Sequence, residues 1–352
     1  MFLTETLSPV GYLLNIIFLC IGVLLLVKGA DYFVASASSI AKKFKISSLI
    51  IGLTVVSFGT SAPELAVSLT SSIKGASGLA LGNVVGSNIA NLALVLGLSA
   101  LISPIAIKKS LCKREFPFLL LTSLILIIFS FDNLLAGYSG IANILSRGEA
   151  IIFLGGIVAF CYLSIVLAKK DAAEGIDMES EEEEVVEMPM LKTIILLLVG
   201  LAGIMIGAEF VTTPASNIAI SIGVSANIDK QLMTNLVGLT VVAIGTSLPE
   251  LVTSVMAAKK GENEIAVGNV VGSNIFNILF ICGCSGVITP LTMTSDIMTD
   301  MVLALVLTGL VFMLSKTGKL QRKYGAILIA CYVIYLIYIV VRLFNPSLVI
   351  PA

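Results

Sequence analysis

The sequence contains no histidine, and only 12% of its residues are charged. Without histidine, the chain lacks the commonest protein ligand for transition metals and the usual general base of enzymes. A soluble domain carries about 25% charged residues, so this chain has too little charge to cover a globule in water. Together with a hydrophobic fraction of 57%, the low charge predicts a protein that is integral to a membrane.

Other signals are also missing. The chain has no basic arm, so no nucleic-acid partner is expected. No basic residue precedes the first apolar run, where Glu5 is the only charge, and the N-terminal segment is therefore not predicted to be a signal peptide. The six cysteines lack the spacing of a metal site, and we interpret them as small apolar residues.

Ten segments are apolar and long enough to be candidate membrane spans, although the fourth is short. A spanning helix needs roughly 20 mostly apolar residues. The candidates lie near residues 11–34, 46–72, 79–103, 117–132, 149–168, 190–213, 231–257, 265–289, 297–315 and 324–343.

The positive charges are divided unequally between the two sides of these spans. If the N-terminus is outside, 16 of the 21 Lys and Arg residues fall in inner loops and four in outer loops. Positive residues concentrate in cytoplasmic loops, so this bias predicts a multi-pass cell-membrane protein with both termini outside and the central connection in the cytoplasm. That connection, residues 169–189, is acidic and is interpreted as a solvated linker. Regulatory calcium binding is less favoured there, because contiguous glutamates lack the spaced ligands and turn glycine of a calcium loop.

Two pairs of segments repeat at one offset of 186 residues. Residues 52–72 match residues 238–258 at 12 of 21 positions, and residues 82–105 match residues 268–291 at 13 of 24. The chain is therefore divided into a first transmembrane repeat, residues 1–168, the linker, and a second repeat, residues 190–352. Five spans per repeat is an odd number, so the second repeat must insert upside down. The predicted fold is an all-α membrane protein with ten transmembrane helices in two inverted-topology repeats, a plan that places the site near the bilayer midplane.

Each repeat carries the motif Gly-Thr-Ser-x-Pro-Glu in the middle of an apolar segment, at residues 59–64 and 245–250. A carboxylate at this depth is costly unless it is paired, protonated or hydrated, so Glu64 and Glu250 are predicted to be functional. Helical spacing places two hydroxyl residues on the face of each glutamate: Thr60 and Ser61 beside Glu64, and Thr246 and Ser247 beside Glu250.

Proline is predicted to break the helix within this motif. Pro63 and Pro249 have no N–H, so the carbonyls of Gly59 and Gly245 lose their helical partners. Broken backbone is tolerated within a membrane where it lines a cavity. Each break should therefore gather a carboxylate, hydroxyls and freed carbonyl oxygens.

A second motif adds amides and close packing. Residues four apart share a helix face, which pairs Ser87 with Asn91 and Ser273 with Asn277. Glycines four apart, at 82 and 86 and at 268 and 272, predict a close helix approach that would bring these asparagines to the glutamates. Asn88 and Asn274 point elsewhere and are left out of the predicted site.

The resulting ligands are all oxygens, which suit hard cations such as calcium, sodium or magnesium rather than copper or zinc. Magnesium usually keeps several waters, so a dry cage favours calcium. Two glutamates balance one divalent cation. Because the empty, ionised site would hold unpaired charge in low dielectric, the site should cross the membrane only when neutralised, and exchange would be obligatory.

These motifs resemble the two alpha-repeats of sodium/calcium exchangers in the cation/calcium antiporter superfamily, of the prokaryotic type with a short central loop. The resemblance implies a calcium site formed by Glu64 and Glu250 with the carbonyls of Thr60 and Thr246. It implies flanking sodium sites that draw on the carbonyls of Ser57 and Ala243, the hydroxyls of Ser61, Ser87, Ser247 and Ser273, and the amides of Asn91 and Asn277. Calcium and sodium are then transported ions. No cofactor, no enzymatic activity and no obligatory protein partner are expected.

Two positions depart from relatives. Some relatives have aspartate where this chain has Asn277, so the chain lacks that titratable group, and the position of Ser57 is often alanine. The superfamily also includes Ca²⁺/H⁺ antiporters, which remain the principal alternative. A cation channel and an intramembrane enzyme are weaker alternatives, the latter because histidine and a Gly-x-Gly-Asp motif are missing.

Overall fold

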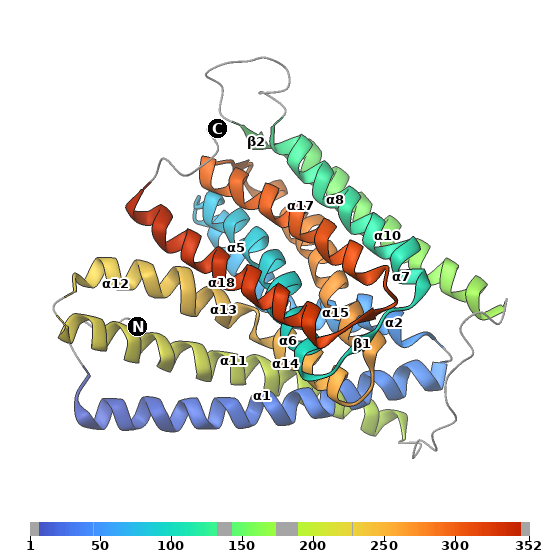
Figure 1. Cartoon of the computed structure of the whole chain (residues 1–352), viewed down its shortest axis with the longest axis horizontal. Coiled ribbons are helices and arrows are strands. Elements are labelled where there is room, and N and C mark those ends of the chain that lie inside the picture. Colours follow the sequence, from blue (N-terminus) through green and yellow to red (C-terminus); the bar gives the residue numbers. More distant parts are fainter. Residues whose placement is uncertain (1–6, 45, 132–142, 174–188, 227, 346–352) are drawn as a thin grey trace.

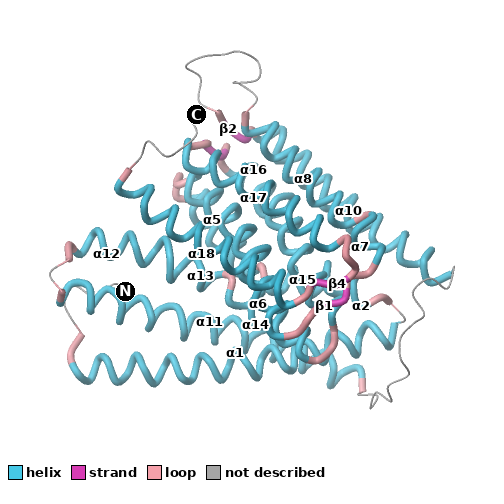
Figure 2. The backbone as a smooth tube through the Cα atoms, in the orientation of Figure 1, coloured by secondary structure: helices cyan, strands magenta, loops and turns pink. Residues whose placement is uncertain are grey.

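The structure is a computed structural model that describes residues 7–44, 46–131, 143–173, 189–226 and 228–345. The described chain is almost entirely helical, with four two-residue strands (Figure 2). Seven helices are long and apolar enough to cross a membrane, or up to nine if each of two bent helix pairs is one span. These helices make the protein a multi-pass membrane protein.

Two long helices, α1 (Pro9–Phe44) and α11 (Met190–Ser225), lie side by side along one edge of the molecule (Figure 1). They cross at glycines. A Cβ atom on Gly22 would lie 2.9 Å from the carbonyl oxygen of Gly207, and one on Gly29 would lie 2.8 Å from that of Gly200. Because any side chain at these positions would meet backbone, glycine permits this approach.

Each half of the chain next contains a bent helix. In the first half it comprises α2 (Ser48–Ile51), a π-helical segment η1 (Gly52–Val56), α3 (Ser57–Thr60) and α4 (Ala62–Ile73), with a bend of 48° before α4. In the second half it comprises α12 (Lys230–Val237), η3 (Gly238–Val242), α13 (Ala243–Thr246) and α14 (Leu248–Lys259), with a bend of 54°. The break that proline predicted is therefore present in both halves.

Two further helices form the centre of the molecule. They run through α5 (Ser77–Ala90), η2 (Asn91–Val95) and α6 (Leu96–Ile102), and through α15 (Asn263–Phe276), η4 (Asn277–Ile281) and α16 (Cys282–Ile288). In their most apolar stretches 72% and 94% of the residues are buried, against 11% to 44% in the other five unbroken candidate spans, so these two helices are the core. Their π turns begin at Asn91 and Asn277, positions that are 186 residues apart.

Four more long helices surround this core: α8 (Glu115–Ser130), α10 (Arg147–Ala173), α17 (Ser295–Ser315) and α18 (Arg322–Phe344) (Figure 1). A short helix, α7 (Lys109–Lys113), precedes α8. The α8 helix has 16 residues, and at about 1.5 Å per residue it is too short to cross an apolar core of about 30 Å without help. The fourth predicted span falls on this helix, so a count of ten is not reached within the described ranges.

The fifth predicted segment ends later than residue 168. The α10 helix continues through Ala173, so the first residues assigned to the acidic linker are helical. Lys169 and Lys170 are good helix formers and extend the helix beyond its apolar part. The rest of the predicted linker, residues 174–188, lies outside the described residues.

The connections between helices gather at two ends of the molecule. At one end, β1 (Ile105–Ala106) pairs antiparallel with β4 (Lys319–Leu320), and Lys108 Nζ lies 2.7 Å from Glu264 Oε1. At the other end, β2 (Ile144–Leu145) pairs antiparallel with β3 (Leu291–Thr292). Lys108 and Lys319, for which the sequence predicted an inner position, lie at the first end.

Candidate functional site

The two helix breaks bring Glu64 and Glu250 into the interior. Ser61 and Ser247 leave helical geometry with ψ angles of 7° and 5°, and proline follows two residues later in the first turn of α4 and of α14. Each glutamate thus stands in the first turn of a helix that starts inside the protein, where the positive end of the helix dipole favours a carboxylate. Both glutamates are 1% exposed.

The backbone at the break is partly satisfied. Ser61 N–H donates to Ser57 O at 3.0 Å, and Leu65 N–H donates to Ser61 O at 3.1 Å. The carbonyl of Thr60 takes part in neither bond. The carbonyl of Gly59 lies four residues before Pro63, which has no N–H to donate to it.

The two hydroxyl groups that precede Glu64 donate hydrogen bonds to residues in the second half of the chain. Ser61 Oγ donates to Glu250 Oε1 at 2.9 Å, and Thr60 Oγ1 donates to Asn269 Oδ1 at 3.0 Å. Helical spacing predicted that both would face Glu64. The prediction assumed a continuous helix, whereas the bend at Ser61 turns these side chains across to α14 and α15.

Ser273 also reaches Glu250, with 3.4 Å between its Oγ and Oε1. Ser61 and Ser273 therefore converge on one carboxylate oxygen from different halves of the chain. Ser87, the residue equivalent to Ser273, is buried on α5 one turn before Asn91. The structure thus brings two of the four predicted serine ligands, Ser61 and Ser273, to Glu250, and Ser247 is buried at the break before Glu250.

The two amides are also buried and have one end fixed. Asn91 Nδ2 donates to Asn274 Oδ1, and Asn277 Nδ2 donates to Asn88 Oδ1, both at 3.0 Å. With the nitrogen used in this way, the oxygen is the atom that each amide leaves available. Asn88 and Asn274, which were left out of the predicted site, therefore contact two of its members.

Among the described residues, several buried oxygens of the predicted site have no hydrogen-bond partner. They are Glu64 Oε1 and Oε2, Asn91 Oδ1, Ser247 Oγ, Glu250 Oε2 and Asn277 Oδ1. Buried acceptors without donors are costly, and a cation satisfies them without any N–H or O–H. The described chain contains no group of three or more His, Cys, Asp or Glu residues that could hold a metal, so a cation here would depend on hydroxyl, amide and carbonyl oxygens besides the two carboxylates.

Equivalent residues of the two halves have different surroundings. Ser57 and Thr60 are fully buried, whereas Ala243 is exposed and Thr246 is half-buried. Ser61 bonds Glu250, whereas Ser247 Oγ and both oxygens of Glu64 lack partners among the described residues. The structure therefore covers Ser57 and Thr60 before the first break and leaves Ala243 and Thr246 before the second more exposed.

The glycine pairs show the same difference. A Cβ atom on Gly272 would lie 2.6 Å from Leu53 O, and one on Gly268 would lie 2.8 Å from Leu49 O. At Gly82 and Gly86 a Cβ would meet no atom within 4 Å among the described residues. The predicted close approach is thus confirmed for α15 against the first bent helix. The α13 segment of the second bent helix neighbours α5, but no described atom comes close to Gly82 or Gly86.

Sequence reasoning missed two further asparagines. Asn83 Nδ2 donates to Ser68 Oγ at 3.0 Å and to the carbonyl of Glu64 at 3.2 Å. Asn269 makes the equivalent bonds to Ser254 Oγ and to the carbonyl of Glu250. Both stand in the repeated Gly-Asn-Val-Val-Gly segment, so a polar residue repeated within an apolar helix was the signal that could have identified them.

Comparison with known proteins gives a consistent result. The profile of the family described as "Sodium/calcium exchanger protein" matches residues 14–166 and 192–341. The sodium/calcium exchanger MaX1 of Methanosarcina acetivorans is 35% identical over 350 residues, covering 92% of this chain and 97% of that protein. The inner membrane protein YrbG of Escherichia coli is 37% identical over 273 residues, covering 77% and 79%.

A solved structure of the sodium-calcium exchanger NCX_Mj superimposes on this chain with a TM-score of 0.75. The two sequences are 30% identical, and the match covers 92% of this chain and 98% of the other. The likeness therefore extends over nearly the whole of both proteins.

Proposed function

Because the chain belongs to the sodium/calcium exchanger family, we propose that it exchanges Ca²⁺ for Na⁺ across the cell membrane at a site built on Glu64 and Glu250. The transport is secondary and active, so a gradient of one ion drives the other. The carbonyls of Thr60 and Thr246 complete the calcium site. The carbonyls of Ser57 and Ala243, four serine hydroxyls and the amides of Asn91 and Asn277 supply the sodium sites.

The observation that carries this proposal is the set of buried site oxygens without hydrogen-bond donors. Two carboxylates, two amides and a hydroxyl contribute to that set. Hard cations take such oxygens in irregular geometry, and calcium accepts six to eight of them. One Ca²⁺ balances the two carboxylates, as do two monovalent ions. An empty ionised site would hold unpaired charge in low dielectric, which disfavours movement without an ion and couples the two fluxes.

We assign alternating access to two inverted repeats, residues 1–168 and 190–352, related by the offset of 186 residues. The unequal surroundings of equivalent residues support this assignment. Exchange of roles between the halves would bring η3 against Gly82 and Gly86, as η1 now lies near Gly268 and Gly272. It would also cover Ala243 and Thr246 and release Ser57 and Thr60.

The end of the molecule that holds β1, β4 and Lys108 is assigned to the cytoplasm, with both termini outside. Lys108 and Lys319, which the sequence placed in inner loops, lie at this end, and positive charge concentrates on the cytoplasmic side. In this orientation, the more exposed residues before the second break, Ala243 and Thr246, lie toward the external side.

The test is calcium uptake by vesicles that contain the purified protein. An outward sodium gradient should drive uptake of radioactive calcium, and Glu64→Gln or Glu250→Gln should abolish it, because each removes one of the two charges that bind calcium. Glu149→Gln is the matched control, since Glu149 caps the start of α10 through Ser146 and lies outside the site. Undiminished uptake in both site variants would refute the assignment.

The same vesicles identify the counter-ion. Sodium and proton gradients are imposed separately at equal membrane potential. Uptake that follows the sodium gradient supports the proposal. Uptake driven by a pH gradient in the absence of sodium would instead identify a Ca²⁺/H⁺ antiporter.

A further inference from the structure

Four buried asparagines connect the two core helices through a ring of hydrogen bonds. Asn88 Nδ2 donates to the backbone carbonyl of Asn274 at 3.4 Å, and Asn274 Nδ2 donates to that of Asn88 at 3.2 Å. Their side-chain oxygens accept from Asn277 and Asn91, respectively, at 3.0 Å. Each amide of the candidate site is therefore held by an asparagine of the opposite half.

The ring determines which end of each ligand amide faces the site. An amide has a donor end and an acceptor end of similar size, and only its oxygen attracts a cation. The bonds to Asn88 and Asn274 occupy the nitrogens of Asn277 and Asn91, and the two Oδ1 atoms are left without partners among the described residues. Without the ring, either amide could turn its N–H groups toward the cation.

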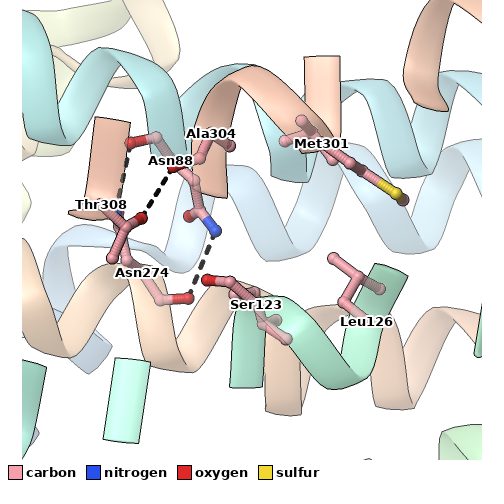
Figure 3. Close-up of a pocket in the computed structure, with 9 residues that line it drawn as sticks. Asn88, Ser123, Leu126, Asn274, Met301, Ala304 and Thr308 are labelled. Carbon is pink, nitrogen blue, oxygen red and sulfur yellow. Dashed lines mark hydrogen bonds between the residues drawn. The ribbon is translucent and has the colours of Figure 1, made fainter. Parts of the chain in front are cut away.

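The neighbouring hydroxyl groups do not compete for the hydrogen bonds of the ring. It lies where η2 and η4 begin, and the N–H of Asn91 is directed at the carbonyls of Ser87 and Asn88. On one side it borders a small cavity that also includes Ser123 of α8 and Thr308 of α17 (Figure 3). Both hydroxyls donate to carbonyls of their own helices, those of Leu119 and Ala304, so they do not compete for the ring.

We propose that Asn88 and Asn274 are positioning residues that present the oxygens of Asn277 and Asn91 to the transported cation, each acting across the interface between the halves. This inference rests on the proposed function, because it requires that Asn91 and Asn277 bind the cation. Partners of metal ligands typically contribute 10- to 100-fold to metal affinity. Loss of either positioning residue should therefore weaken calcium binding about tenfold or more.

The test is a set of double-mutant cycles on calcium affinity, measured by calorimetry on the purified full-length protein. Asn88→Ala should weaken binding in the wild type and have almost no further effect in Asn277→Ala, where the amide it positions is gone. In the Asn91→Ala background, adding Asn88→Ala should reduce calcium affinity as much as it does in the wild type. Asn274→Ala should show the reverse pattern, coupled to Asn91 and independent of Asn277.

A merely structural role would not produce this crossed pattern. Equal losses from Asn88→Ala in all backgrounds, or no loss, would overturn the inference. Asn91→Ala and Asn277→Ala with unchanged affinity would overturn the proposed site as well. Thr308→Val, a near-isosteric change in the same cavity, is the control and should leave affinity unchanged. If the alanine variants fold poorly, Asn88→Ser and Asn274→Ser keep a polar group that is too short to reach the partner amide, and the same cycles apply.

A separate observation concerns the ion pairs at the two ends of the site. Lys260, in the turn after α14, lies 2.6 Å from Asp31 Oδ1 on α1 and also donates to the Asp31 carbonyl at 2.9 Å. Ser38 of α1 donates to Glu262 in the same turn. These contacts tie α1 to the second bent helix at the cytoplasmic end.

The equivalent residues at the other end are apart. Lys74 follows α4 as Lys260 follows α14, and Gly75 and Gly261 after them share φ angles of 75° and 79°. In the crossing of α1 and α11, Gly22 contacts Gly207 and Gly29 contacts Gly200, so Gly22 of α1 is equivalent to Gly200 of α11 and Gly29 to Gly207. Equivalent residues of the two helices are therefore 178 positions apart, which makes Glu209 the equivalent of Asp31. Lys74 and Glu209 are both exposed, and Glu209 accepts only from Thr213 of its own helix among the described contacts.

We infer that the two ion pairs form in turn: Asp31 with Lys260 in the conformation described, and Glu209 with Lys74 in the opposite one. This inference rests on alternating access, and not on which ions are carried. Exposed ion pairs contribute little stability, which suits a contact that breaks in every cycle. Loss of one pair should shift the ratio of the two conformations by about two- to fivefold.

Hydrogen–deuterium exchange of the purified protein tests this inference through segments 55–61 and 241–247. Lys260→Glu breaks the pair with Asp31 and favours the opposite conformation, so amide hydrogen exchange should become faster in segment 55–61 and slower in segment 241–247. Lys74→Glu should not produce this pattern. Adding Asp31→Lys to Lys260→Glu should restore the wild-type pattern. Lys259→Glu, with the same charge change in the same turn, is the control. Equal effects of Lys260→Glu and Lys259→Glu would overturn the inference, and Lys260→Gln gives a milder version if reversal impairs folding.

Discussion

The amide at position 277 limits the charge of the candidate site. Asn277 donates to Asn88 and leaves its oxygen toward the site, so the two glutamates are the acidic groups of this centre. An aspartate in its place would set a carboxylate oxygen against Asn88 Oδ1, and only the protonated form could replace the lost donor. The burial of the position favours the same protonated form.

Asn277→Asp should therefore make calcium uptake pH-dependent. The added carboxyl is neutral at low pH, where one Ca²⁺ still balances the two glutamates, and it becomes an unpaired charge as pH rises. Uptake by the variant should therefore fall as pH rises, over a range where the wild type changes less. Vesicle uptake at fixed sodium gradient and varied, symmetrical pH measures the effect. Asn345→Asp, which adds a carboxylate outside the site, should keep the wild-type profile. Identical profiles for Asn277→Asp and the wild type would contradict the prediction.

Residue identities in the site were largely predictable, but their pairings were not. Glu64 and Glu250 could be selected because a repeated carboxylate in an apolar helix is costly without a function. Ser61 was expected beside Glu64 and instead bonds Glu250. This pairing depends on the bend at Ser61 and on contact between the halves, and neither follows from spacing along one helix.

At the scale of elements, proline and π turns shape the four interrupted helices. Pro63 and Pro249 made the two bends predictable, because their chemistry stops a helix locally. The π turns at 52–56, 91–95, 238–242 and 277–281 were not predicted. They contain ordinary apolar residues besides the polar ones, and π turns are rare features that often accompany functional sites. Packing of the core therefore decides them.

Equivalent glycines should respond differently to the same substitution. Gly272→Ala places a methyl group against Leu53 O, and overpacking of this kind costs about 1–3 kcal/mol. Gly86→Ala meets no described atom within 4 Å in this conformation, and alanine is the better helix former, so it should not lower thermal stability. Gly86→Ala should nevertheless slow the exchange of Ca²⁺ for Na⁺, because the opposite conformation would bring η3 against this position. Unfolding curves and vesicle uptake of both variants provide the measurement, and equal effects of the two substitutions would count against the assigned exchange of roles.

For the whole molecule, the sequence was sufficient to predict a membrane protein with repeated segments, but it was not sufficient to predict the number of spans. Low charge and the conserved offset of 186 residues carry the first prediction. The span count depended on apolar length, which α8 at 16 residues does not reach. Short helices can stand between longer ones when neighbours cover their ends, and one sequence does not reveal such coverage.

Binding of calcium should stabilise the whole protein, because both glutamates are buried and three of their four carboxylate oxygens lack hydrogen-bond partners among the described residues. A ligand that binds only the folded state adds about 2.7 kcal/mol at 100 times its dissociation constant. The thermal unfolding midpoint in detergent should therefore rise with calcium, and also with high sodium, but not with an equal ionic strength of a large organic cation. Glu64→Gln removes a buried carboxylate that lacks hydrogen-bond donors, so this variant should unfold at a higher temperature than the wild type without calcium and gain little from adding it. A wild type that is insensitive to calcium, or a variant that still gains fully from it, would show that these carboxylates do not hold the ion.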